Sequence, residues 1–395
     1  MRCSLFAYGF RPFFLAAGIS ALVLVPWWAG AFAFGLPLGS DWPPTLWHAH
    51  EMLFGFIAAA IAGFLLTAVP SWTGQRGFAG RPLVLLATVW ALGRLLVSSS
   101  GLWPLALVAA LDLAFLPALA GMLAWPLLRS RNRNTPLLVV LGLLWLANAT
   151  FYRALAHGNA ALAATALRIG IDIVLLLMTV IGGRIIPAFT SSGLKARGDS
   201  GALHAWPGIT PAAIAAMAIV AVLDILGPDS RSAGIAALVA GLIQLLRLLR
   251  LLRLLQWRPL QTLRTPLVWV LHLAYAWLPV GLLLKATALL SGAAVAAFWL
   301  HALTIGALTT MILAVVTRAT LGHTGRPLAA SPVVVAAYLL LASAAVVRVF
   351  GLVFLGHRYP AVIVLSALLW TASFAAFLVV YAPMLCLPRA DGKPG

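Results

Sequence analysis

Long apolar segments recur along the whole chain and are separated by short clusters of Pro, Gly and charged residues. Each segment has roughly twenty residues, the length that an α-helix needs to cross a bilayer. Because lipid offers no partner for backbone N–H and C=O groups, such segments are expected to be helical. We expect an all-α polytopic membrane protein of about twelve transmembrane helices. The predicted spans are 13–34, 47–70, 82–99, 103–128, 136–156, 165–187, 207–227, 232–252, 266–290, 295–317, 332–355 and 360–384.

The composition leaves little room for a soluble domain. Of 395 residues, 63% are hydrophobic and 9% are charged, and the mean hydropathy is +1.05. Soluble proteins carry about 25% charged residues. The connections between the predicted spans are short, so we expect a single integral-membrane domain over residues 1–395. The first apolar run lacks a clear cleavage site and is expected to be a retained span.

The net charge of +18 does not indicate a nucleic-acid partner, because the basic residues are scattered among short connections. Most of them fall on one side of the membrane if the chain begins in the cytoplasm. This bias predicts cytoplasmic N- and C-termini in a multi-pass protein with the lipid bilayer as its surroundings.

Histidines occur at the predicted outer end of two spans. The stretch WHAHEMLFGF contains His48, His50 and Glu51, and His301 enters the tenth span from the same side. Residues two positions apart on a helix, such as His48 and His50, point in directions that differ by about 200°. Either His48 is still in the cap, or the two histidines serve different sites. A polar pair beside the interfacial Trp47 is the alternative.

Buried imidazoles in a membrane indicate function, because an unpaired polar group there is costly. Haem iron takes axial ligands on opposite faces of the ring. His50, or His48, opposite His301 satisfies this geometry, and His272 and His323 on the inner side are left over as a second candidate pair. Capping of the tenth helix is the alternative for His323.

The charged residues singled out within the predicted spans are Glu51, Arg94, Asp112, Asp172, Arg184 and Arg348. They could pair with one another, handle protons, or, for an arginine, anchor a propionate. We expect Glu51 to serve the outer site as a catalytic group and not to be a structural salt-bridge partner. Only Cys3 and Cys386 are present, without a Cys-x-x-Cys-His motif, so any haem would be non-covalent.

A faint internal recurrence links the two outer histidine segments. His50 precedes Gly55 by five residues, as His301 precedes Gly306, and Gly-Arg-Pro-Leu follows both spans. If the chain contained three repeats of four helices, spans two, six and ten would be equivalent.

The chain contains the motifs GFRPFFL (9–15), WHAHEMLFGFIAAAIAGFLLTAVPSWTG (47–74), GRIIPAFTSSGL (183–194) and TRATLGHTGRPL (317–328). Over essentially the whole chain they resemble the NnrS family. The resemblance implies a bacterial inner-membrane protein with haem b and copper, associated with denitrification and with protection from nitric oxide. With it, we predict a haem between His50, or His48, and His301, and a second metal site, with haem or copper, at His272 and His323. Arg318, in the last motif, is a candidate cofactor-binding residue. No adjacent His-His pair is present, which argues against a copper site of the haem-copper oxidase pattern.

The predicted function is thus a role in the nitric oxide response, by binding or reducing nitric oxide at a membrane-embedded haem. A reductase would need an electron donor such as a quinol or a cytochrome, and a scavenger or a sensor would fit the sequence equally well. A secondary transporter of a small solute is the alternative class, and would predict repeats of half the chain and unwound helices in the membrane.

Overall fold

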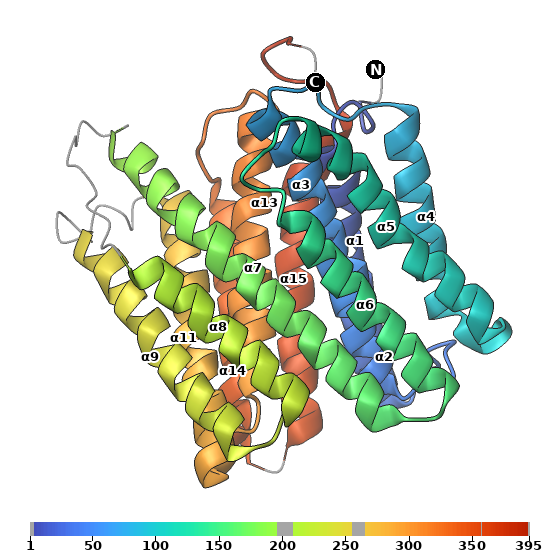
Figure 1. Cartoon of the computed structure of the whole chain (residues 1–395), viewed down its shortest axis with the longest axis vertical. Coiled ribbons are helices and arrows are strands. Elements are labelled where there is room, and N and C mark those ends of the chain that lie inside the picture. Colours follow the sequence, from blue (N-terminus) through green and yellow to red (C-terminus); the bar gives the residue numbers. More distant parts are fainter. Residues whose placement is uncertain (1–3, 196–207, 255–264, 357, 394–395) are drawn as a thin grey trace. The chain divides into compact units, whose positions relative to one another are not determined.

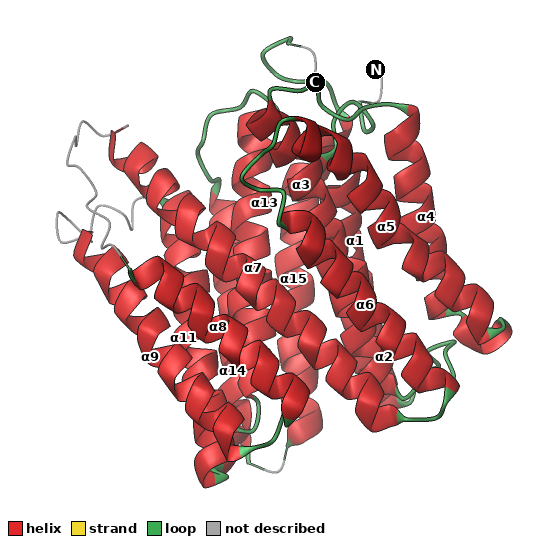
Figure 2. Ribbon diagram, in the orientation of Figure 1, coloured by secondary structure: helices red, strands yellow, loops and turns green. Residues whose placement is uncertain are grey.

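Helices make up all the regular structure of the described residues. The computed structural model describes residues 4–195, 208–254, 265–356 and 358–393, and these contain no strand (Figure 2). Twelve of the helices, some interrupted, are long and apolar enough to cross a membrane by length and composition. The prediction of about twelve spans in an all-α protein is confirmed.

Ten spans are single helices, labelled in Figure 1 where there is room. They are α1 (Phe10–Phe34), α4 (Arg81–Ser98), α5 (Leu105–Arg129), α6 (Leu137–Ala156), α7 (Ala160–Lys195), α8 (Ile209–Leu226), α9 (Arg231–Leu254), α11 (Pro266–Ser291), α14 (Pro332–Leu355) and α15 (Tyr359–Cys386). Short 3-10 turns lie at η2 (Ser100–Leu102) and η4 (Ala294–Ala296).

Spans two and ten have an unusual and matching construction. Span two runs from α2 (Pro44–His50) through a π-helix, η1 (Glu51–Ile57), into α3 (Ala58–Thr73). Span ten runs from α12 (Trp299–His301) through a π-helix, η5 (Ala302–Thr309), into α13 (Thr310–His323). In each, a histidine is the last α-helical residue before the π-helix. π-Helices are rare in proteins, but those that occur often lie at functional sites. His50 and His301 are therefore candidates for functional positions. The threefold repeat stays a prediction.

Proline and glycine set several helix ends. Pro44 and Pro332 are the first residues of α2 and α14, where the missing N–H of proline costs nothing. Gly35, Gly74 and Gly292 follow the last residues of α1, α3 and α11 in the left-handed conformation, with φ of 68°, 64° and 68°. Glycine adopts this conformation without a steric penalty and ends the helix there.

The chain divides into two compact units, each built from segments far apart in the sequence. Unit 1 comprises Met1–Gly170, Ala319–Pro327 and Trp370–Gly395, and unit 2 comprises Ile171–Arg318 and Leu328–Leu369. The predicted single domain over residues 1–395 stays a prediction.

Unit 1 brings both ends of the chain together. The Ser4 amide donates to the Cys386 carbonyl at 2.8 Å, and the two ends lie at the same end of this unit in Figure 1. Arg11 is fully buried, and its Nη1 donates to the carbonyls of Leu385 and Leu387 at 3.0 and 2.7 Å. The Leu385 carbonyl belongs to the last turn of α15, where carbonyls have no partner within the helix, and Leu387 follows that helix. The arrangement is that of an even number of spans; the cytoplasmic side stays a prediction.

Unit 2 contains a fully buried ion pair between Asp224 of α8 and Lys285 of α11. The Lys285 ammonium also lies 4.9 Å from the ring centre of Trp299. Elsewhere on α11, the Tyr275 hydroxyl accepts a hydrogen bond from Arg247 of α9 at 3.0 Å, and Arg247 also donates to the Thr179 carbonyl at 3.1 Å. These four polar side chains are therefore paired with groups on other helices of the unit.

Candidate functional site

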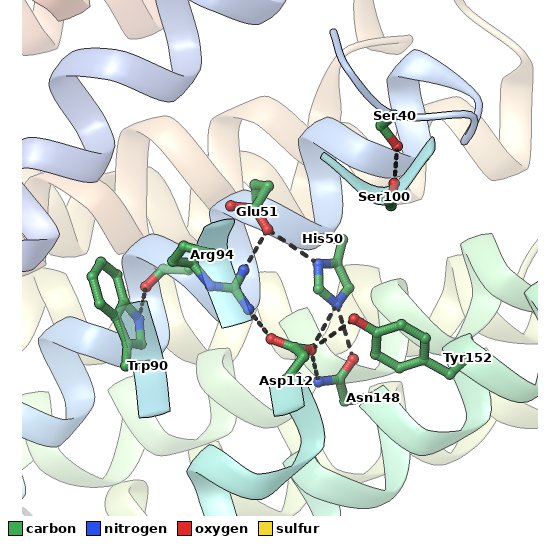
Figure 3. Close-up of polar contacts among 10 residues, drawn as sticks. Ser40, His50, Glu51, Trp90, Arg94, Ser100, Asp112, Asn148 and Tyr152 are labelled. Carbon is green, nitrogen blue, oxygen red and sulfur yellow. Dashed lines mark hydrogen bonds and ion pairs between the residues drawn. The ribbon is translucent and has the colours of Figure 1, made fainter. Parts of the chain in front are cut away.

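The largest polar group within the described part of unit 1 surrounds His50. We call it the His50 network (Figure 3). It joins side chains from α2, η1, α4, α5 and α6: His50, Glu51, Arg94, Asp112, Asn148 and Tyr152. Each residue of the network is buried, with exposures between 0% for His50 and 9% for Arg94. Burial in an apolar bundle strengthens these electrostatic contacts, because little water screens them.

Asp112 lies at the centre of the network. Its Oδ2 accepts hydrogen bonds from Asn148 Nδ2 at 2.7 Å and from the Tyr152 hydroxyl at 3.1 Å. The Arg94 guanidinium forms ion pairs with both Asp112 and Glu51. The network therefore contains two carboxylates and one guanidinium, and its formal charge is −1 when His50 is neutral.

The imidazole of His50 has a defined orientation in this network. Its Nε2 lies 3.0 Å from Asn148 Oδ1 and 3.3 Å from Asp112 Oδ2. Both neighbours are acceptors, so Nε2 carries a hydrogen and donates it. Nδ1 lies 3.5 Å from Glu51 Oε1. In this arrangement Nε2 is used in a hydrogen bond and is not available as a metal ligand.

The structure contradicts one expectation about Glu51, that of its ion pairing. The expectation that it is not a structural salt-bridge partner is wrong, because its Oε1 pairs with Arg94 Nη1. A side chain at position 55 would place a Cβ 3.2 Å from Arg94 Cδ, so Gly55 leaves room for this pair. The Gly55 carbonyl, within the π-helix, accepts a hydrogen bond from Trp90 Nε1 at 3.2 Å. The catalytic role of Glu51 stays a prediction.

Aromatic rings separate His50 from the surface of unit 1. Phe151 stacks on the imidazole with ring centres 4.7 Å apart, and Trp42 meets it edge-on at 5.4 Å. Trp42 also lines a partly open pocket of about 420 Å³, together with Asp41, Ser100 and Trp103. The Ser40 and Ser100 hydroxyls, 2.7 Å apart, tie the segment before Trp42 to η2. Trp42 is therefore the wall shared by the pocket and the His50 network.

His48 faces a different environment. It is helical, as part of α2, and its ring stacks on Trp28 of α1 with centres 4.2 Å apart. The rotation of about 200° between the two positions accounts for the separation. Of the two alternatives drawn from the sequence, the structure has the second, in which His48 and His50 face different surroundings.

His301 and His272 lie in unit 2. His301 is half-buried, and its ring centre lies 6.4 Å from that of Phe298. His272 is buried, and its Nε2 lies 3.1 Å from the Thr190 hydroxyl of α7. The predicted haem between His50 and His301 involves residues of both units and stays a prediction.

Arg318 approaches the same part of α7 as His272. Its guanidinium carbon lies 4.3 Å from the ring centre of Phe189, which adjoins Thr190. Arg318 is buried and forms no ion pair with a described carboxylate. We call His272, Thr190, Phe189 and Arg318 the His272 group. In this group a buried imidazole and a buried cation contact two neighbouring residues of α7, Thr190 and Phe189.

His323, the last residue of α13, lies in unit 1. Its ring stacks on Tyr8, with centres 6.3 Å apart, and packs against Phe10 at 5.5 Å. Its carbonyl accepts a hydrogen bond from Arg389 Nη1 at 2.9 Å. His272 and His323 thus belong to different units, and the predicted metal site that joins them stays a prediction. Among the residues that the structure describes, no three His, Cys, Asp or Glu side chains form a preassembled metal site.

Sequence reasoning identifies part of the His50 network and misses the rest. Arg94 and Asp112 are recognisable as charges within spans. Asn148 and Tyr152 are not singled out, although their spacing of four residues on α6 places both on one helix face. Lys285, at the outer edge of its span by the sequence, is fully buried against Asp224. Only the tertiary arrangement of α8 and α11, each of which packs on α9, reveals this partner.

Comparison with known proteins agrees with the resemblance seen in the motifs. No curated protein matches the chain. The family model described as NnrS protein matches residues 4–389, which include both histidine-bearing π-helical spans and the whole His50 network. The chain therefore belongs to the NnrS family.

Proposed function

We propose that this membrane protein acts in the response to nitric oxide in the bacterial inner membrane, by binding or reducing nitric oxide at a non-covalent b-type haem. Membership of the NnrS family and twelve candidate spans support a role of this kind. Nitric oxide is small and apolar, so it reaches a membrane-embedded site through lipid and needs no polar pore.

The observation that carries the haem proposal is the His272 group. A b-type haem needs an imidazole for its iron, apolar or aromatic walls, and cations for its two propionates. His272 supplies the imidazole, Phe189 an aromatic face, and Arg318 a buried cation without a carboxylate partner among the described residues. His301, half-buried beside Phe298, is the second candidate ligand in unit 2. The residues present therefore fit a haem.

Bound haem would supply an iron centre that binds nitric oxide and exchanges one electron. The chain's own residues would hold and orient it. Thr190, hydrogen-bonded to His272 Nε2, would fix the plane of the imidazole and leave Nδ1 for the iron, since one ring nitrogen of a ligating histidine binds the metal and the other is held by a second partner. Arg318 would hold a propionate by charge-assisted hydrogen bonds.

His50 is not a haem ligand in this proposal and stays a member of the His50 network. Its Nε2 donates within the His50 network, and ligation there would leave Asn148 and Asp112 without this donor. An unsatisfied buried acceptor is costly. His48 and His323, each stacked on an aromatic ring, are the proposed candidates for copper, which imidazole suits.

Absorption spectroscopy of the purified full chain tests the proposal. We expect a Soret band that shifts on addition of dithionite and again on addition of nitric oxide, and complete haem extraction by acid–acetone. His272→Ala and His301→Ala are expected to lower the haem content of protein that still inserts. His157→Ala is the matched control, since His157 is exposed and bonded only to the Arg153 carbonyl among the contacts described.

A second measurement separates a reductase from a binding protein. Reduced quinol analogue or reduced cytochrome is supplied, and nitric oxide is followed with an electrode. Consumption of many equivalents per chain supports a reductase, and uptake of one equivalent per haem supports a scavenger or sensor. A protein free of haem and copper after expression with sufficient haem would overturn the proposal and favour the transporter.

A further inference from the structure

Arg348 of α14 carries a buried positive charge without a carboxylate partner among the described residues. It is 6% exposed. Its Nη2 donates to the Tyr359 hydroxyl at 3.1 Å. Its Nη1 is buried and has no hydrogen-bond partner among them. A guanidinium in this state is costly, because ion desolvation is offset only by good acceptors.

Other buried cations of the chain are satisfied in different ways. Arg94 and Lys285 pair with carboxylates. Arg247 donates to oxygen atoms of Thr179 and Tyr275. Arg318 shares the lack of a carboxylate, and we have assigned it to the proposed cofactor. The Nε of Arg94 is also buried without a hydrogen-bond partner, but that guanidinium pairs with two carboxylates. Arg348 differs from Arg94, Arg247 and Lys285 because its Nη1, at the end of the guanidinium fork, meets no oxygen of the described residues and no described carboxylate offsets its charge.

Aromatic rings line the guanidinium. Its carbon lies 4.6 Å from the ring centre of Phe298 and 5.5 Å from that of Tyr359. The two rings stack on each other, with centres 5.8 Å apart and planes 18° from parallel. Cation–π attraction to such rings offsets part of the desolvation cost. It provides no acceptor for Nη1, because a ring face does not replace a hydrogen-bonding oxygen.

The neighbouring backbone adds positive potential. Tyr359 is the first residue of α15, a helix of 28 residues, and the N-terminal end of a helix favours negative charge. Arg358 precedes it and is exposed. The guanidinium, with its unpartnered Nη1, therefore lies against the side chain of the first residue of α15, beside the Phe298 ring that also contacts His301.

We propose that Arg348 binds an anionic oxygen ligand of planar, two-oxygen geometry, such as a carboxylate or nitrite. This geometry matches the guanidinium fork, and it supplies the acceptor that Nη1 lacks. The oxygen comes either from a free small anion or from a propionate of the haem. Only the second source rests on the proposed function.

Thermal unfolding of the full chain in nanodiscs tests for the site. Formate and nitrite are titrated at constant ionic strength against chloride. A ligand that binds only the folded protein raises Tm in a saturable way. We expect this rise for wild type, a weaker rise for Arg348→Lys, and none for Arg348→Gln. Arg247→Gln is the matched control and is expected to respond as wild type does, since its guanidinium is already satisfied by oxygen atoms.

A second arm distinguishes the two sources. Haem and its dimethyl ester, in which both propionates are neutral, are added to haem-depleted protein. If a propionate occupies the site, Arg348→Gln weakens binding of haem but not of the ester, and formate stabilises only haem-depleted protein. If a free anion occupies it, formate stabilises the haem-loaded protein as well, and Arg348→Gln binds haem as wild type does.

The outcomes separate this site from the proposed function. Absence of a saturable formate or nitrite effect in wild type, with equal haem and ester binding by wild type and Arg348→Gln, would overturn the site. It would leave Arg348 held by the Tyr359 hydroxyl and the two aromatic rings alone. A formate effect in a protein that binds no haem would support the site while the proposed function fails. Because the wild-type titration decides the first question, poor folding of Arg348→Gln does not prevent the test.

Discussion

Asp224 and Lys285 form an ion pair between α8 and α11 in which neither side chain is exposed. Their sequence separation is large, and each is the only close opposite charge that the described structure gives the other. In the low dielectric of a bundle, removal of one partner leaves the other charged and unpaired. The stability of the protein should therefore depend on the presence of both charges.

Lys285→Met is expected to destabilise the protein by about 3–5 kcal/mol, the usual cost of an orphaned buried charge. Lys285→Met combined with Asp224→Asn is expected to recover most of that loss, because no charge stays unpaired. Reversible unfolding in mixed micelles of increasing SDS content measures both. A double variant as unstable as the single variant would show that the pair contributes packing and not charge compensation.

Glu51→Gln tests the catalytic role predicted for Glu51. The change keeps the shape of the side chain and removes the charge that pairs with Arg94. We expect haem content to be retained and nitric oxide consumption or protection to fall on the order of 10²-fold, the usual contribution of a general acid or base.

Asp112→Asn is the matched control for Glu51→Gln, since Asp112 is the other carboxylate that pairs with Arg94. It is expected to reduce stability in SDS without a comparable loss of activity per folded protein. Equal effects of the two variants on activity would contradict a special role for Glu51 and would leave the His50 network as structure.

Gly306 in the π-helix of span ten is expected to tolerate no side chain. A Cβ at this position would collide with the indole of Trp277. Because both groups are held in packed helices, Gly306→Ala is expected to cost about 1–3 kcal/mol. Gly121→Ala is the control, since a Cβ at position 121 in α5 meets no atom within 4 Å.

Trp277→Leu removes the indole with which this Cβ would collide. In a Trp277→Leu background, Gly306→Ala is therefore expected to cost much less stability than it does in wild type. Unfolding in SDS compares wild type with both single variants and the double variant. Equal losses for Gly306→Ala and Gly121→Ala in the wild-type background would show that the close approach of Trp277 is not needed.

The orientation in the membrane is tested at the two ends of α4. Gln75 and Leu102 lie in the connections before and after this helix, and both are exposed, Leu102 by 79%. In a background with both native cysteines replaced by serine, Leu102→Cys is expected to react with an impermeant maleimide in intact cells. Gln75→Cys is expected to react only after permeabilisation, because basic residues favour the cytoplasmic side. The reverse labelling pattern would place both chain ends outside.

The sequence by itself determined the number of spans, their apolar character and some of their ends. A bilayer requires about twenty apolar residues per helix, and Pro or Gly marks several helix ends at positions visible in the sequence. Thus Pro332 and Gly292 predict the helix ends found for α14 and α11. The sequence-based bounds 165–187 fall short of α7, which runs from Ala160 to Lys195. His50, Arg94 and Asp112 also stand out among the apolar residues of their spans, because charge and imidazole are rare in lipid.

Tertiary structure alone decided which of these groups meet. Arg94, Asp112 and Asn148 come from three helices, and no periodicity within one helix encodes the packing that joins them. The π-helices after His50 and His301 were equally hidden, because one extra residue per turn leaves an apolar segment apolar. Local length and hydropathy dictate what each helix can bury. Partners such as Asp224 for Lys285 depend on contacts between distant helices, which exist only once those helices pack.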